Sequence, residues 1–104
     1  MEIKINTNNH VEGSERMKTY FKDVISESLK RFEDKITRIE VHIGDENAHK
    51  SGDNDKRCMI EARIAGMQPV AATNHAETTE KAVSGAIDKI KSILTTAFDK
   101  MKSH

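Results

Sequence analysis

The chain has 104 residues, which is enough for one domain with a single core but close to the size at which stability margins become thin. Hydrophobic residues make up 36% and charged residues 33%, and 17 basic side chains balance 17 acidic ones. This balance excludes a global positive field as the basis for binding a polyanion, so such a function would depend on how the charges are distributed. We expect one domain over residues 1–104.

The cysteine content and the hydropathy pattern indicate the cellular compartment. The single cysteine, Cys58, excludes an internal disulfide framework and suits a reducing environment. The N-terminal residues lack the apolar segment of a secretion signal, and no stretch approaches the roughly 18 apolar residues needed to span a membrane. We therefore expect a cytoplasmic protein with no membrane partner.

The first part of the chain reads as strand, helix, strand. Residues 2–8 alternate, with Ile3 and Ile5 on one face, which predicts a strand. Ser14 is a favourable N-cap for the helix that follows. The buried stripe of that helix is expected to contain Met17, Tyr20, Phe21, Val24, Ile25, Leu29 and Phe32. A second strand over 36–44 completes a unit that normally joins two parallel strands by a right-handed crossover.

Two more strands are expected after a polar segment. Residues 45–55 lack apolar periodicity, and their acidic residues do not match the spacing of an EF-hand, so we predict a long hairpin loop rather than a calcium site. The third strand covers residues 56–65. Its inward positions are Cys58, Ile60, Ala62 and Ile64. After a turn at Gly66, residues 69–74 form the fourth strand, and Pro69 at its start favours an edge position because proline lacks a backbone donor.

The segment 78–102 predicts the longest element, a helix with one wide apolar stripe that packs on a sheet. The stripe contains Val83, Ala86, Ile87, Ile90, Ile93, Leu94, Ala97, Phe98 and Met101. The opposite face carries a row made of Lys81, Gly85, Lys89, Ser92, Thr96 and Lys100. Because small residues separate the lysines, an anion could approach this row closely. The alternative is an ordinary solvated face.

The element order β-α-β-β-β-α predicts an α+β domain in which two helices pack on one face of a four-stranded mixed sheet. The sequence contains no metal-ligating histidine spacing, phosphate-binding loop, dinucleotide fingerprint or nucleophile elbow. We therefore expect a binding module rather than an enzyme, without catalytic residues, metal, cofactor or small-molecule substrate. Glu27 with Arg31, and Asp88 with Lys91, have the spacing of ion pairs on a helix.

Two segments carry a resemblance to a known family. Residues 1–43 run from a strand through asparagines, the acidic-apolar pair Val11 and Glu12 and the Ser14 cap into a helix and a second strand. Residues 85–90, followed by Leu94, open the long last helix. In this order and spacing the segments resemble the ribosome hibernation-promoting factor family, also known as ribosome-associated inhibitor or sigma-54 modulation proteins. The resemblance covers nearly the whole chain, in the short single-domain form.

The resemblance implies a translation inhibitor that binds rRNA of the small ribosomal subunit in the decoding groove. There it would block messenger and transfer RNA and silence ribosomes in stress or stationary phase. The residues expected to contact RNA are Lys22, Arg31, Arg63, Lys81, Lys89, Lys100 and Lys102. After Leu94 the last helix of the family is usually a run of lysines and arginines, whereas this chain reads TTAFDKMK. Ser92 and Thr96 also stand where basic residues are common in the family. Fewer phosphate contacts would weaken binding or change its balance.

A small protein–protein interaction module without RNA binding is the alternative function. In that case Met59, on the outer face of the sheet, would seat a partner, and the mixed charges around it would form a polar rim. The two functions differ in one geometric respect: RNA binding requires the basic residues of both helices to converge on one groove. In solution we expect a monomer or a weak dimer.

Overall fold

A computed structural model of the chain describes residues 1–8, 15–45 and 55–102. Its elements are β1 (Glu2–Thr7), α1 (Glu15–Ser28), the single-turn 3-10 helix η1 (Lys30–Phe32), β2 (Ile36–Asp45), β3 (Lys56–Ile64), β4 (Val70–Ala76) and α2 (Thr79–Lys102). The predicted order β-α-β-β-β-α and the α+β class are confirmed. The expected Ser14 cap and residues 46–54 of the predicted loop lie outside the described residues.

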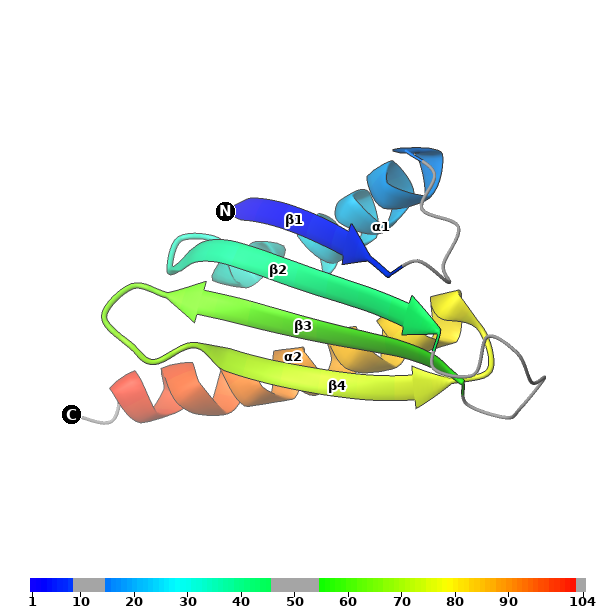
Figure 1. Cartoon of the computed structure of the whole chain (residues 1–104). Coiled ribbons are helices and arrows are strands. Elements are labelled where there is room, and N and C mark those ends of the chain that lie inside the picture. Colours follow the sequence, from blue (N-terminus) through cyan, green and yellow to red (C-terminus); the bar gives the residue numbers. More distant parts are fainter. Residues whose placement is uncertain (9–14, 46–54, 103–104) are drawn as a thin grey trace.

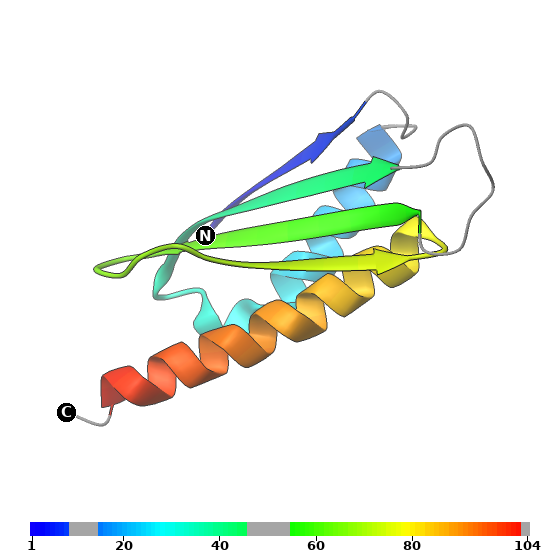
Figure 2. The same ribbon diagram turned by 60° about the horizontal axis from the view of Figure 1, so that its bottom comes forward.

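The four strands form one mixed sheet in the order β1-β2-β3-β4, with β1 parallel to β2 and the other neighbours antiparallel (Figure 1). Both helices lie on the same face of this sheet (Figure 2). Helix α2 packs against β3 and β4, and α1 packs at the β1 side. The edge strands are β1 and β4, as Pro69 led us to expect for the last strand.

The core lies between the helices and the sheet, because each strand turns its apolar residues to the same face. Ile39, Val41 and Ile43 of β2 are buried beside the inward residues of β3. The largest fully buried side chains are Ile25, Leu29, Ile39, Ile43, Ile60, Ile90, Leu94, Val41, Val83 and Cys58. The predicted inward faces of both central strands form one cluster with most of the α2 stripe: Val83, Ala86, Ile87, Ile90, Leu94 and Phe98, with Ile93 packed against it.

Lys56 forms ion pairs where the end of β2 meets the start of β3. Its Nζ lies 3.1 Å from Asp45 Oδ2 and 3.3 Å from Asp55 Oδ2, and Asp55 is buried. The hydrogen bond to Asp45 is the main cause of a raised pKa for Lys56, with a further contribution from Asp55. Asp45 and Lys56 are also the last register partners of the two strands. The side-chain contacts therefore coincide with the end of the ladder.

Two details of the first helix differ from prediction. Tyr20 was expected in the buried stripe, but it is 51% exposed, whereas Phe21 and Ile25 are buried and Met17 and Val24 pack against the core. The helix also ends at Ser28 rather than continuing to Phe32. The following turn is tighter, with the Phe32 N–H donating to the Leu29 carbonyl, and it places the Phe32 ring 5.4 Å from that of Phe98.

The fourth strand was predicted over residues 69–74, and the structure places it at Val70–Ala76. The shift follows from the length of β3. Because Lys56 and Arg57 already belong to β3, their partners Ala76 and His75 are drawn into the ladder. Backbone pairing thus overrides the weak strand signal of these polar residues.

Phe98 provides a test of how the C-terminal half of α2 is docked. The side chain is 8% exposed and packs on Phe32, so Phe98→Ala should lower the free energy of unfolding by about 3–5 kcal/mol, measured by chemical denaturation. Lys100→Ala, at an exposed position one half-turn further on, should change it by about 0.5 kcal/mol or less. Equal effects of the two substitutions would contradict this docking.

Cys58 tests the register of β3. Its side chain is fully buried, and this burial raises the pKa of the thiol to about 12. Because thiol reagents attack the thiolate, native protein at neutral pH should react only as fast as it unfolds. The control carries Cys58→Ala together with Met59→Cys, which moves the thiol to the outer face of the sheet and should allow rapid labelling. Rapid labelling of Cys58 in the native protein would show that the assigned register is wrong.

Candidate nucleic-acid interface

The turn η1 carries Arg31 to the junction between the two helices. One terminal nitrogen of Arg31, Nη2, donates a hydrogen bond to Thr95 Oγ1 of α2 at 2.7 Å. The guanidinium carbon also lies 4.5 Å from the centroid of the Phe32 ring. Among the residues that the structure describes, no ion pair joins Arg31 to Glu27 as the helical spacing predicted, and α1 ends before Arg31. An exposed cation is thus held in one orientation by a hydrogen bond and by stacking.

Basic side chains from both helical segments meet beside this contact. A hollow of about 490 Å³ is lined by Glu27, Ser28, Lys30, Arg31 and Lys91. A neighbouring hollow of about 250 Å³ shares Arg31 and adds Lys35 and Asp34 to the apolar side chains between the helices. Together the two hollows hold four basic and two acidic side chains, so the junction is locally positive although the chain as a whole is neutral. We call this surface the helix junction.

Lys91 lines the helix junction and does not form the ion pair that its spacing predicted. Within the described part of the chain, no ion pair joins Lys91 to Asp88. Neither Lys91 nor Lys30 was among the residues predicted to contact RNA, although both line the helix junction. Lys91 and Thr95 are four residues apart, so they lie on the same side of α2, next to the apolar stripe. This spacing is the signal in the sequence that could have indicated that this side of α2 faces the other helical segment.

Lys81 and Lys89 lie on the opposite flank of α2, beside the β4 edge. Lys81 Nζ is 2.7 Å from Glu77 Oε1, and this hydrogen bond raises the pKa of Lys81 and lowers that of Glu77. Lys89 Nζ donates to the backbone carbonyl of Thr73 at 2.9 Å. The row of lysines predicted to face outward therefore makes contacts within the protein along part of its length.

Gly85, in the same row, is explained by packing rather than by access for an anion. Asn74 Nδ2 lies 3.3 Å from the Lys81 carbonyl oxygen and 3.4 Å from that of Ala82. A Cβ at Gly85 would collide with the amide group of Asn74. Glycine at position 85 thus leaves room for the Asn74 side chain of β4. That side chain fills the space through which the sequence had suggested that an anion could approach the helix.

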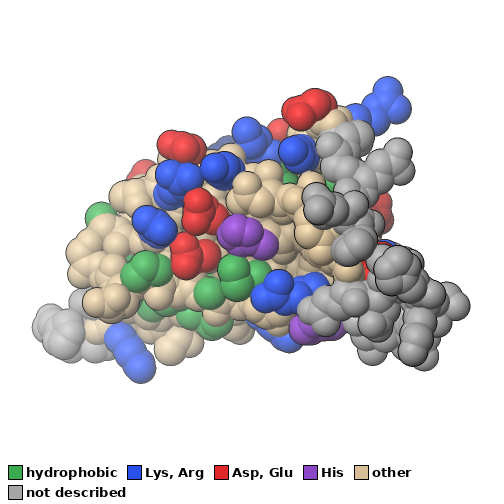
Figure 3. Space-filling view, in the orientation of Figure 1, with side chains coloured by type: hydrophobic (Ala, Val, Ile, Leu, Met, Phe, Trp, Pro, Cys, Tyr) green, Lys and Arg blue, Asp and Glu red, His purple; other side chains and the backbone are tan. Residues whose placement is uncertain are grey.

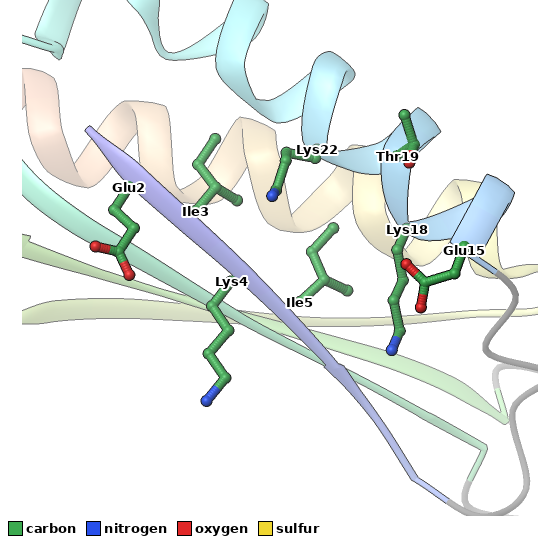
Figure 4. Close-up of a pocket in the computed structure, with 8 residues that line it drawn as sticks. All are labelled: Glu2, Ile3, Lys4, Ile5, Glu15, Lys18, Thr19 and Lys22. Carbon is green, nitrogen blue, oxygen red and sulfur yellow. The ribbon is translucent and has the colours of Figure 1, made fainter.

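The other predicted residues are dispersed. Lys22 lines a separate hollow beside β1, shown in Figure 4. Arg63 lies on the outer sheet face, 3.4 Å from Glu61 and 4.0 Å from Glu40. Lys100 is exposed on α2, and Lys102 ends that helix with a side chain outside the described set. Of the six predicted RNA contacts whose side chains the structure describes, Arg31 alone lines the helix junction.

The outer face of the sheet carries both signs of charge. Arg38 lies 3.0 Å from Glu40, and Figure 3 shows basic and acidic side chains next to one another on this face. Met59 is partly buried there, between its register partners His42 and Thr73. Such a mixture does not form a basic surface for a polyanion.

The described residues contain no group of three or more His, Cys, Asp or Glu side chains that could hold a metal ion. Among the same residues, neither helix combines the length and the apolar character required to cross a bilayer.

The chain matches one protein family model and is similar in structure to solved proteins. Residues 3–102 match the family model described as Sigma 54 modulation protein / S30EA ribosomal protein. The N-terminal domain of Protein Y from Thermus thermophilus is similar in structure, with a TM-score of 0.68 and 17% identity over 88% of this chain and 93% of that one. A ribosomal subunit interface protein from Coxiella burnetii gives a TM-score of 0.70 and 17% identity over 95% and 99%. No curated protein sequence matched the chain.

A double-mutant cycle tests the contact between Asn74 and Gly85. In the native background, Gly85→Ala should displace Asn74 and lower the free energy of unfolding by about 1 kcal/mol, because two lost hydrogen bonds outweigh the gain in helix propensity. In an Asn74→Ala background, the same substitution should stabilise by about 0.5–1 kcal/mol. Equal effects in the two backgrounds, measured by denaturation, would mean that the residues do not touch.

Proposed function

The chain belongs to the Sigma 54 modulation protein / S30EA ribosomal protein family, and on that premise we propose that it is a ribosome-associated translation inhibitor that binds small-subunit rRNA. Bound in the decoding groove, it would exclude messenger and transfer RNA and hold ribosomes inactive in stress or stationary phase. This function places the protein in the cytoplasm, acting as a monomer or weak dimer without catalysis. The similar Coxiella burnetii structure is described as a ribosomal subunit interface protein, which agrees with such a role.

The observation that supports RNA binding best is the convergence of Lys30, Arg31 and Lys91 at the helix junction. These cations come from η1 and α2, and the exposed hydrogen bond from Arg31 to Thr95 joins the two segments. A guanidinium held in one orientation can bind a phosphate through two parallel hydrogen bonds, and the flanking lysines add point charges. The helix junction therefore suits the backbone of a folded RNA.

Contacts of this kind position an RNA without reading its bases. We therefore propose that recognition depends on the shape of the rRNA groove and on phosphate spacing. The neutral overall charge limits long-range attraction, so affinity would come from a few local contacts. Lys100 and Lys102, toward the end of α2, would extend these contacts beyond the helix junction.

The helix junction is tested by Arg31→Gln combined with Lys91→Gln. If both side chains contact phosphates, the variant should bind small ribosomal subunits more weakly and reduce the log–log salt slope of the affinity by about 1.5. Co-sedimentation with purified subunits across a salt series measures both effects. The melting temperature should change little, because the Arg31–Thr95 bond is exposed.

The matched control is Lys81→Gln combined with Lys89→Gln, which removes the same charge from the β4 side of α2. These lysines already contact Glu77 and Thr73, so this pair should have the smaller effect on affinity. A larger effect of the control pair would move the interface to the β4 side. If neither pair changes binding and Met59→Asp abolishes a complex instead, the protein-interaction alternative would replace RNA binding.

A further inference from the structure

One edge of the sheet presents a backbone that is free to pair. The Asn8 N–H donates to the Ile43 carbonyl at 3.1 Å, so the backbone of Asn8 faces β2. Alternate residues of a strand turn their backbone groups to the same side, and Lys4 and Asn6 therefore face β2 as well. The N–H and C=O groups of Ile3, Ile5 and Thr7 point away from the sheet. Within the described residues, no hydrogen bond reaches this side of β1.

The opposite edge of the sheet is partly blocked. The outward carbonyl of Thr73 on β4 accepts a hydrogen bond from Lys89, and the neighbouring Asn74 side chain bonds to the backbone of α2. Pro69 precedes β4 and has no N–H to offer. Natural sheets use lysine and proline in this way to block the pairing of edge strands. At the β4 edge, contacts with α2 and the missing N–H of Pro69 hinder strand pairing, and we call it the guarded edge. At the β1 edge the outward backbone groups are available for pairing, and we call it the open edge.

The open edge borders a groove of about 380 Å³ between β1 and α1. Its lining residues are Glu2, Ile3, Lys4, Ile5, Glu15, Lys18, Thr19 and Lys22. In Figure 4, Ile3 and Ile5 point toward α1, and the side chains of Lys18 and Lys22 reach from α1 toward β1. An incoming strand would therefore meet apolar surface, the ammonium groups of Lys18 and Lys22, and the Glu15 carboxylate beside Lys18.

The spacing of the two lysines matches that of alternate residues in a strand. Lys18 and Lys22 are one helical turn apart, a rise of about 6 Å along α1. Side chains on one face of a strand repeat every two residues, or about 6.6 Å. Glutamate or aspartate at positions i and i+2 of an added strand could therefore each face one lysine, whereas lysines at those positions would be repelled.

We propose that β1 binds an extended acidic segment of a partner protein as an additional strand. The backbone of Ile3, Ile5 and Thr7 would supply the hydrogen bonds, and Lys18 and Lys22 would select carboxylates at alternate positions. This site is separate from the helix junction, and it assigns Lys22 a protein ligand in place of RNA.

The probe is a synthetic eight-residue peptide that alternates threonine and glutamate. At low ionic strength, its binding should protect the amides of Ile3, Ile5 and Thr7 from hydrogen exchange in an NMR experiment. The amides of Lys4 and Asn6, which already face β2, should keep their exchange rates. This odd–even pattern distinguishes strand addition from a contact made by side chains alone.

Two sets of controls complete the experiment. Lys18→Gln with Lys22→Gln should weaken peptide binding roughly tenfold, whereas Lys81→Gln with Lys89→Gln, an equal change of charge at the guarded edge, should not. The same peptide N-methylated at alternate amides, and a threonine–lysine peptide, should both fail to bind.

The proposal is wrong if the acidic peptide does not bind, if the N-methylated peptide binds as well, or if odd and even amides respond alike. Protection of Ile3, Ile5 and Thr7 that rises with protein concentration in the absence of peptide would identify a second copy of the chain as the occupant instead. An RNA oligonucleotide that binds through Lys18 and Lys22 when the peptide does not would also overturn it, and would return Lys22 to the RNA interface.

Discussion

The packing of the apolar stripe of α2 on the sheet determines the arrangement of the remaining elements. Ile90 and Leu94 are fully buried against the strands, so the helix cannot rotate about its axis without exposing them. This fixed rotation directs Lys91 and Thr95 toward η1, and it directs Lys81 and Lys89 toward β4. The charged surface is thus set by residues that carry no charge.

The same constraint explains how far the sequence predicts the structure. Alternation in the strands and the three-and-four spacing in α2 each define one buried face. Burial of apolar surface is the largest favourable contribution to the free energy of folding. The element order, the sheet type and the core could therefore be predicted from the pattern. Periodicity does not say which neighbour lies on each flank of a buried face. The lysine row is exposed as expected, but periodicity did not indicate that Lys89 contacts Thr73 or that Gly85 leaves room for Asn74.

Prediction of the candidate site was limited by the same lack of information about neighbours. Arg31 was expected as an RNA contact, but the structure groups it with Lys30 and Lys91. Lys91 is far away in the sequence, and Lys30 has acidic neighbours that gave no reason to select it. The contact between Arg31 and Thr95 spans 64 residues of the chain, and no local pattern reports it. Asp88 illustrates the opposite error, since helical spacing suggested an ion pair with Lys91 that is absent from the described part of the structure. Spacing along the sequence predicts which side chains are neighbours on one helix. It does not predict whether a side chain contacts a residue of a second element instead, as Arg31 contacts Thr95.

Lys56 has a consequence for how this sheet can vary. Because it contacts Asp45 and Asp55 at the point where the β2–β3 ladder ends, the register of the hairpin is fixed by the strands and by this cluster. The connecting segment need not impose the register through its own turn geometry. Its length can then change at a modest entropic cost, about 0.6 kcal/mol for each doubling, without exchanging the two faces of the sheet. The hairpin is therefore a place where sequences of this fold can diverge in length while keeping the same core.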